Sequence, residues 1–149
     1  MAPFIALSSL FLVLAGLGAA GVHALDGWHT PLRFALAGMF LLTASAHWGK
    51  RRADLVRMVP PVFPRPDLLV TLTGVLELLG AVGLLLPRLA PWAAGGLSLL
   101  LLALFPANVH AARAGLSIAG RRATALGPRT LLQLVFLGAT LAVALAGPR

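Results

Sequence analysis

The segment LLVTLTGVLELLGAVGLLL, residues 68–86, decides the fold because it is long and apolar enough to cross a bilayer as one helix. Glu77 lies near its centre. A carboxyl group at this depth is far from bulk water, so it must be protonated, paired, or in contact with a polar cavity. The segment therefore predicts a membrane helix that carries one acid in need of a partner.

The composition of the whole chain is that of a membrane protein. Hydrophobic residues make up 59% of the 149 residues, charged residues make up 11%, and the mean hydropathy is +0.93. A soluble domain carries about 25% charged residues. The length predicts a single membrane domain over residues 1–149. The sequence contains no cysteine, which excludes disulfides, thiolate metal sites and thiol redox chemistry carried by this chain.

Five segments approach the ~20 apolar residues that a helix needs to cross a hydrocarbon core about 30 Å thick. Pro31, Pro91 and Pro128 stand at segment starts, where a missing amide donor costs nothing. Strand-like alternation of polar and apolar residues is absent. The predicted fold is an all-α, polytopic membrane helical bundle. Its predicted transmembrane helices cover residues 3–25, 31–48, 67–86, 91–112 and 128–146.

The first of these segments has two interpretations. Val22, His23 and Ala24 resemble a signal-peptide cleavage site with small residues. However, no Lys or Arg precedes the apolar stretch, which favours a retained transmembrane helix. Cleavage would leave four spans with the same sidedness.

The distribution of basic residues predicts the orientation. Two connections on the same side of the membrane hold most of them: Lys50, Arg51, Arg52, Arg57 and Arg65 in one, and Arg113, Arg121, Arg122 and Arg129 in the other. The opposite side carries Arg33, Arg88 and Arg149. The positive-inside rule makes the basic side cytoplasmic, with the N-terminus inside and the C-terminus outside. Because the net charge of +8 is spread over loops that face lipid headgroups, we expect no nucleic-acid partner.

The cytoplasmic loop, residues 49–66, has an internal pattern. Charged and apolar residues alternate at roughly helical spacing over residues 52–59, which predicts a short helix at the membrane surface. Pro60, Pro61, Pro64 and Pro66 then require an extended path. A solvated linker is the alternative interpretation.

Glu77 shares one face of its helix with Thr73, Gly74, Gly80 and Ala81, at spacings of three and four. Small residues on this face let a neighbouring helix approach closely. The acid therefore points toward protein, and about 15 Å of helix separates it from Asp67.

Partners for Glu77 can be chosen by depth. His47 on the second helix, Asn108 and His110 on the fourth, and Gln133 on the fifth all fall in the cytoplasmic half of the membrane. We expect them to form a polar pocket that opens inward, with Glu77 at its floor. The alternative is that the amides serve only as interhelical hydrogen bonds, which contribute about 0.6 kcal/mol each. The carboxyl of Glu77 and the imidazoles of the histidines are groups that bind metals, but no metal-binding spacing is present, so no metal site is predicted.

Five stretches of sequence together resemble the DoxX family of bacterial integral membrane proteins. They are residues 40–48 (FLLTASAHW), 57–66 (RMVPPVFPRP), 74–87 (GVLELLGAVGLLLP), 105–109 (FPANV) and 129–133 (RTLLQ). The resemblance implies a four-helix core, here with an extra N-terminal transmembrane helix, in the bacterial inner membrane. The positions shared with the family fall on His47, Glu77, Asn108 and Gln133. The resemblance also implies a redox-linked membrane complex, in which a partner protein would supply the electrons.

Three functional classes remain open from the sequence. The favoured one is a subunit that binds a hydrophobic, lipid-like or quinone-like ligand through Glu77, His47, Thr73, Asn108 and Gln133. The second is a small enzyme with Glu77 as proton donor or acceptor, assisted by His47. The third is a membrane chaperone or interaction protein, with a membrane or cytoplasmic protein partner or another copy of itself. No cofactor motif is present, so a quinone is expected only as a ligand.

Overall fold

The computed structural model describes residues 2–118 and 120–147; Arg149 and the side chains of Arg121 and Arg122 lie outside the described part. The described chain is almost entirely helical, as predicted. Its helices are α1 (Ala2–Ala19), the 3-10 turn η1 (His23–Leu25), α2 (His29–Ser45), α3 (Arg52–Met58), α4 (Pro66–Leu85), α5 (Ala90–Arg113) and α6 (Leu126–Ala146). Two short strands, β1 (Ser117–Ile118) and β2 (Arg121–Arg122), lie between α5 and α6.

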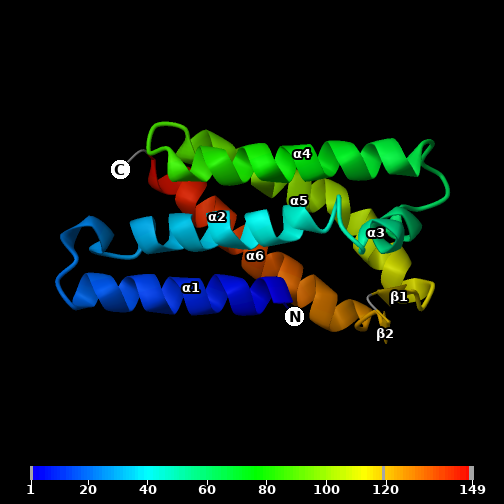
Figure 1. Ribbon diagram of the computed structural model, residues 1–149, viewed down its shortest axis with the longest axis horizontal. Helices are drawn as coiled ribbons and strands as arrows, with labels where there is room; N and C mark the ends of the chain where they lie inside the picture. The colour runs from blue at the N-terminus through cyan, green and yellow to red at the C-terminus, as the bar shows by residue number, and fades with distance from the viewer. Residues whose placement is uncertain (1, 119, 148–149) are drawn as a thin grey trace.

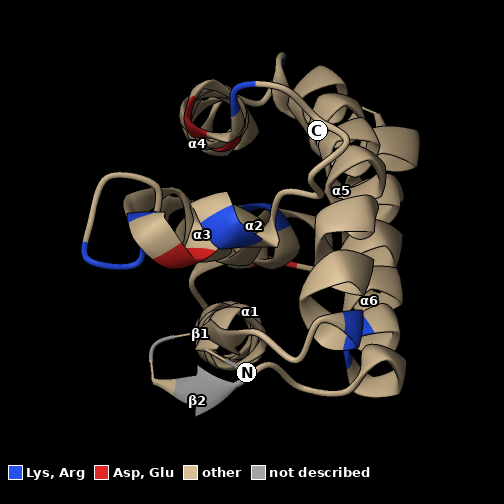
Figure 2. Cartoon of the chain, turned by 90° about the vertical axis from the view of Figure 1, so that its right-hand side faces the viewer, with Lys and Arg blue, Asp and Glu red and all other residues tan. Residues whose placement is uncertain are grey.

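The long helices form two layers that run back and forth along one axis (Figure 1). Helices α1, α2 and α4 lie side by side, and α5 and α6 cross behind them (Figure 2). Helix α2 is central, since it contacts α1, α4 and α6. The N-terminus, α3, and the strands lie toward one end of the bundle, and the C-terminus lies toward the other (Figure 1). We call the end that holds α3 and the strands the basic end, because residues 49–66 and 113–129 meet there.

Four helices in the described part of the chain are long and apolar enough to cross a membrane: α1, α4, α5 and α6. The remaining predicted span, residues 31–48, corresponds to α2, which is 17 residues long and includes His29 and Arg33. Both side chains are buried. Because its neighbours cover α2, its polar residues face protein, and its sequence is less apolar than that of a helix exposed to lipid.

Two local features differ from the sequence-based expectation. The first helix ends at Ala19 instead of residue 25, because Gly21 adopts φ +103° and the Val22 amide donates to the Leu17 carbonyl at 3.1 Å. This is the Schellman arrangement that terminates a helix. The connection before α6, residues 115–127, is rich in Gly, Ala and Arg, and this composition predicts a solvated basic connector. Instead, its backbone forms an antiparallel pair in which Ser117 is opposite Arg122. The helix predicted over residues 52–59 is confirmed as α3.

The core lies where α2 meets the other helices. Its fully buried large side chains include Leu36 and Met39 of α2, Leu84 of α4, Leu97 of α5 and Val143 of α6. Leu7 of α1 extends the same cluster. Outward-facing positions of α4 are mostly leucine and valine, as expected for a surface that contacts lipid.

The sequence predicted that small residues on α4 allow close helix contacts. In the structure, two of its glycines make such contacts, with different neighbours. A Cβ atom added at Gly74 would lie 2.6 Å from the Cβ of His47, which follows α2. One added at Gly80 would lie 2.5 Å from a methyl carbon of Leu97 on α5. Helix α4 therefore contacts α2 and α5 through glycines. In contrast, Gly95 and Gly96 on α5 face open space.

We expect Gly74→Ala to destabilise the protein by about 1–3 kcal/mol, because the new methyl group would force α2 and α4 apart. Thermal unfolding in one detergent, followed by circular dichroism, measures the change. Gly96→Ala is the matched control, because it adds a methyl group to a helical glycine with open space around it. Equal melting temperatures for the two variants would contradict the close contact at Gly74.

Candidate functional site

Glu77 lies buried between α2 and α4, with 5% of its surface exposed. Helix α4 begins at Pro66, so about 16 Å of helix separates Glu77 from the basic end. Its carboxyl Oε2 is 2.6 Å from the hydroxyl Oγ1 of Thr43 on α2. The acid therefore faces protein, as predicted, and its polar partner is a hydroxyl group.

The hydroxyl of Thr43 has two acceptors within reach but only one proton. Oγ1 lies 2.6 Å from Glu77 Oε2 and 3.1 Å from the Phe40 carbonyl oxygen of its own helix. When Glu77 is ionised, Thr43 can donate to the carboxylate. When Glu77 is protonated, it can donate to Oγ1, and Thr43 can then donate to Phe40. The pair therefore accommodates both protonation states of the acid without a second charged group.

His47 lies on the same helix–helix contact, one turn closer to the basic end. Its Nδ1 is 3.2 Å from the Thr43 carbonyl oxygen, and its ring packs against Gly74. Thr43 thus connects the two residues that the sequence singled out, through its hydroxyl to Glu77 and through its carbonyl to His47. We call Thr43, His47, Gly74 and Glu77 the α2–α4 seam.

Asn108 and Gln133 belong to a different hydrogen-bonded set, between α5 and α6. Asn108 Nδ2 donates to Gln133 Oε1 at 3.3 Å, and Arg129 donates from Nη1 to Asn108 Oδ1 at 2.8 Å. Gln133 also donates through Nε2 to the Leu101 carbonyl on α5. Asn108 and Gln133 thus form an interhelical hydrogen bond between α5 and α6. This was the alternative interpretation of these residues.

The sequence predicted that all these groups form one pocket. The hydrogen bonds instead divide them into two separate sets. Glu77 and His47 lie on the α2–α4 seam, whereas Asn108 and Gln133 join α5 to α6. Thr73 takes part in neither set, because its hydroxyl donates to carbonyls of its own helix, Leu69 and Val70. Two pockets on the described residues lie at opposite ends of the bundle, and neither is lined by Glu77.

Sequence reasoning missed three polar contacts inside the bundle. Thr43 could have been found, because it lies four residues before His47 on the same helix face. Ser98 donates to Thr140 at 2.8 Å, and this buried pair joins α5 to α6. Arg33, which is 3% exposed, donates to the Leu85 carbonyl at 3.4 Å. A guanidinium at the C-terminal end of α4 is favourable because the helix dipole is negative there.

No group of three or more His, Cys, Asp or Glu side chains in the described residues is arranged to hold a metal ion. The seam therefore offers proton exchange and hydrogen bonding as its chemistry. Its donors and acceptors are one hydroxyl, one carboxyl and one imidazole.

Residues 36–145 match the family model described as Domain of unknown function (DUF8561). The matched region starts within α2 and ends in α6, so it includes both the α2–α4 seam and the α5–α6 set. No curated protein and no solved structure matches the chain. The comparison thus carries no assignment to the DoxX family.

We expect Thr43→Val to cost about 1–3 kcal/mol of stability, because it leaves the buried Glu77 carboxyl without its hydroxyl partner. Thr43→Ser keeps the hydroxyl and should lose much less. In a Glu77→Leu background the carboxyl is gone, so the same Thr43→Val change should cost less than about 0.5 kcal/mol. The free energy of unfolding in mixed micelles is measured for all five proteins: the wild type, the three single variants and the double variant. An equal cost of Thr43→Val in both backgrounds would show that the two side chains are not coupled.

Proposed function

The chain belongs to the DUF8561 family, and we propose that this multi-span membrane protein binds a hydrophobic small molecule with a polar head at the α2–α4 seam. In this proposal it is a subunit of a membrane complex, and the partner proteins carry out any electron transfer. The observation that carries the proposal is Glu77, an acid buried about halfway along α4 and met by a single hydroxyl. An ionisable acid costs free energy when it is buried in a membrane, so it is an unfavourable residue for a role that only joins two helices.

The proposed topology has five crossings, with the N-terminus in the cytoplasm of a bacterial cell. Helices α1 and α4 run in the same direction, so the chain must return between them, and α2 is the segment that does so (Figure 1). The basic end then lies in the cytoplasm by the positive-inside rule.

Introduced cysteines test this topology directly, because the native sequence contains none. We expect a membrane-impermeant thiol reagent, applied to intact spheroplasts, to label Arg88→Cys but to leave Arg51→Cys unlabelled. After the cells are opened, both should react. Labelling of Arg51→Cys alone in intact spheroplasts would reverse the orientation, and labelling of both positions from outside would remove the crossing by α4, the long helix that separates them.

The type of ligand follows from the groups at the seam. A carbonyl or hydroxyl on a ring could replace Thr43 as the hydrogen-bond partner of Glu77, while apolar side chains of α2 and α4 contact the rest of the molecule. A quinone has this combination of groups. The DoxX resemblance in residues 40–48 and 74–87 implies a redox-linked membrane complex, which is consistent with a quinone ligand. Because the seam is closed around Glu77, binding requires α2 and α4 to separate locally.

The test uses a short-chain benzoquinone and protein reconstituted in nanodiscs. We expect Glu77→Gln to weaken binding at least about tenfold, which corresponds to ~1.4 kcal/mol. Ser98→Ala is the control, because it removes a buried polar contact from the α5–α6 side of the bundle. Unchanged binding in Glu77→Gln, or equal loss in both variants, would contradict a ligand site at the seam.

A specific observation also favours the second candidate, an enzyme that transfers a proton. Thr43 hydrogen bonds to both Glu77 and His47, so a substrate at the seam would meet two groups able to exchange protons. Turnover of a bound molecule that is lost in both Glu77→Gln and His47→Gln would support an enzyme. Binding without conversion supports the ligand-binding subunit.

A further inference from the structure

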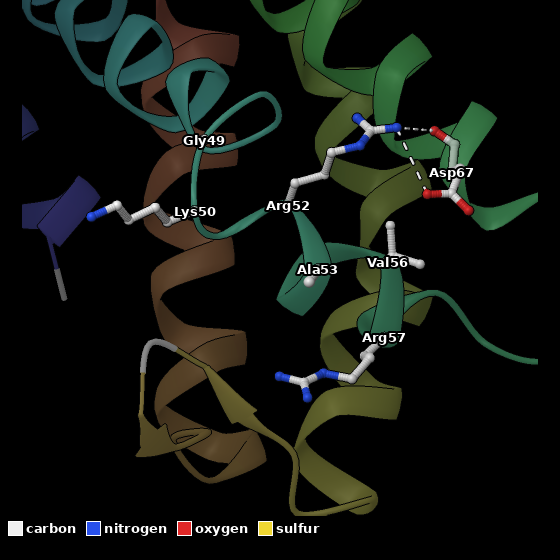
Figure 3. Close-up of a pocket in the computed structure, with 7 residues that line it drawn as sticks. All are labelled: Gly49, Lys50, Arg52, Ala53, Val56, Arg57 and Asp67. Atoms are coloured by element: carbon white, nitrogen blue, oxygen red, sulfur yellow. Dashed lines mark hydrogen bonds and ion pairs between the residues drawn. The ribbon is translucent and has the colours of Figure 1, made fainter.

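The basic end contains an open pocket of about 510 Å³ beside α3. Lys50, Arg52 and Arg57 line it together with one carboxylate, Asp67, so its charge is net positive. Figure 3 shows Arg52 directed at Asp67, while Lys50 and Arg57 extend away from this pair. No residue of the α2–α4 seam lines this pocket, and the pocket takes no part in the proposed function.

Arg52 is fixed in place by the ends of two helices. Its Nη1 donates to the His47 carbonyl at 2.9 Å, and its Nη2 donates to the Asp67 carbonyl and to Thr71 Oγ1, both at 3.0 Å. It also lies 3.9 Å from the Asp67 carboxylate. Arg52 therefore holds the loop after α2 against the start of α4 and compensates the acid in the pocket wall. These hydrogen bonds fix the side of the pocket that Arg52 and Asp67 form.

Lys50 and Arg57 are the remaining cations of the pocket wall. Arg57 is paired with the Asp54 carboxylate, so the net positive charge corresponds to that of Lys50. Arg57 is held by Asp54 on α3 and by the Ser117 carbonyl at 3.3 Å, which fixes its position. A guanidinium carries five N–H donors, so these contacts leave it able to donate further. Lys50 is exposed, and its ammonium group extends from the loop (Figure 3).

The pocket lies at the depth where a membrane helix meets water. Asp67, in its wall, is in the first turn of α4, which is one of the apolar helices long enough to cross the membrane. Trp48, two residues before Lys50, is 50% exposed. Tryptophan is enriched at the headgroup level of membranes. The pocket wall also has apolar parts, Ala53 and Val56 of α3.

We propose that this pocket binds the phosphodiester headgroup of an anionic phospholipid such as phosphatidylglycerol. Lys50 and Arg57 contact the phosphate, and the glycerol backbone lies along Ala53 and Val56. Basic pockets at the cytoplasmic ends of membrane helices are suited to such headgroups, because cationic side chains there meet a phosphate that is held at the same depth. A lipid bound here would contact the loop after α2, α3 and the start of α4 together.

Native mass spectrometry of the full chain in detergent, titrated with phosphatidylglycerol or phosphatidylcholine, tests the proposal. We expect wild-type protein to retain one phosphatidylglycerol in preference to phosphatidylcholine. Lys50→Gln should weaken phosphatidylglycerol binding about fivefold, and Lys50→Gln combined with Arg57→Gln should weaken it further. Lys50→Arg should keep the binding. Arg51→Gln is the matched control, because it removes the same charge from the adjacent position, which does not line the pocket.

Each other outcome contradicts the proposal. Equal losses in Lys50→Gln and Arg51→Gln would mean that only the general charge of the loop attracts lipid. Equal retention of the two lipids would exclude recognition of an anionic headgroup. Glycerol 1-phosphate, added without lipid, identifies the source of the phosphate. If it binds as tightly as phosphatidylglycerol, the pocket takes a soluble phosphate compound instead of a lipid.

Discussion

The absence of water from the hydrocarbon core is the constraint on which this structure depends. Polar side chains inside the bundle must find partners across helix contacts, and each such contact fixes one pair of helices. Thr43 with Glu77 joins α2 to α4, and Ser98 with Thr140 joins α5 to α6. Most of these contacts contribute little energy individually. Together they specify which helices are neighbours among helices whose apolar surfaces are otherwise similar.

Glu77 differs from the other polar groups because its protonation state can change. Amides and hydroxyls can satisfy one another, as Asn108 and Gln133 do. Glu77 has a proton that can leave, and its hydroxyl partner Thr43 can serve either protonation state. Closure of the α2–α4 seam thus keeps the acid dry, and any molecule that reaches it must first separate two helices that are packed through Gly74.

The sequence predicted the helices and their order well, because apolar length and proline positions act locally. It also predicted that Glu77 is buried and that Gly74 and Gly80 permit close contacts. It did not predict which helices would be neighbours. Position along a helix can be counted from the loops, so Asn108 and Gln133 were correctly placed in the halves of their helices nearer the basic end. Their position around the bundle depends on helix rotation and on tertiary packing, and both place them on the α5–α6 contact, away from the α2–α4 seam.

The central position of α2 has a consequence for biogenesis. A helix that carries Arg33 gains little from entering lipid alone, and its guanidinium contacts the end of α4, a helix made later. In a chain with five crossings, the translocon would release α2 before this partner exists. Stable integration of α2 must then wait until α4 has been synthesised, so that the two helices enter the bilayer as a hairpin. In that topology, the loop that joins them would act during co-translational assembly.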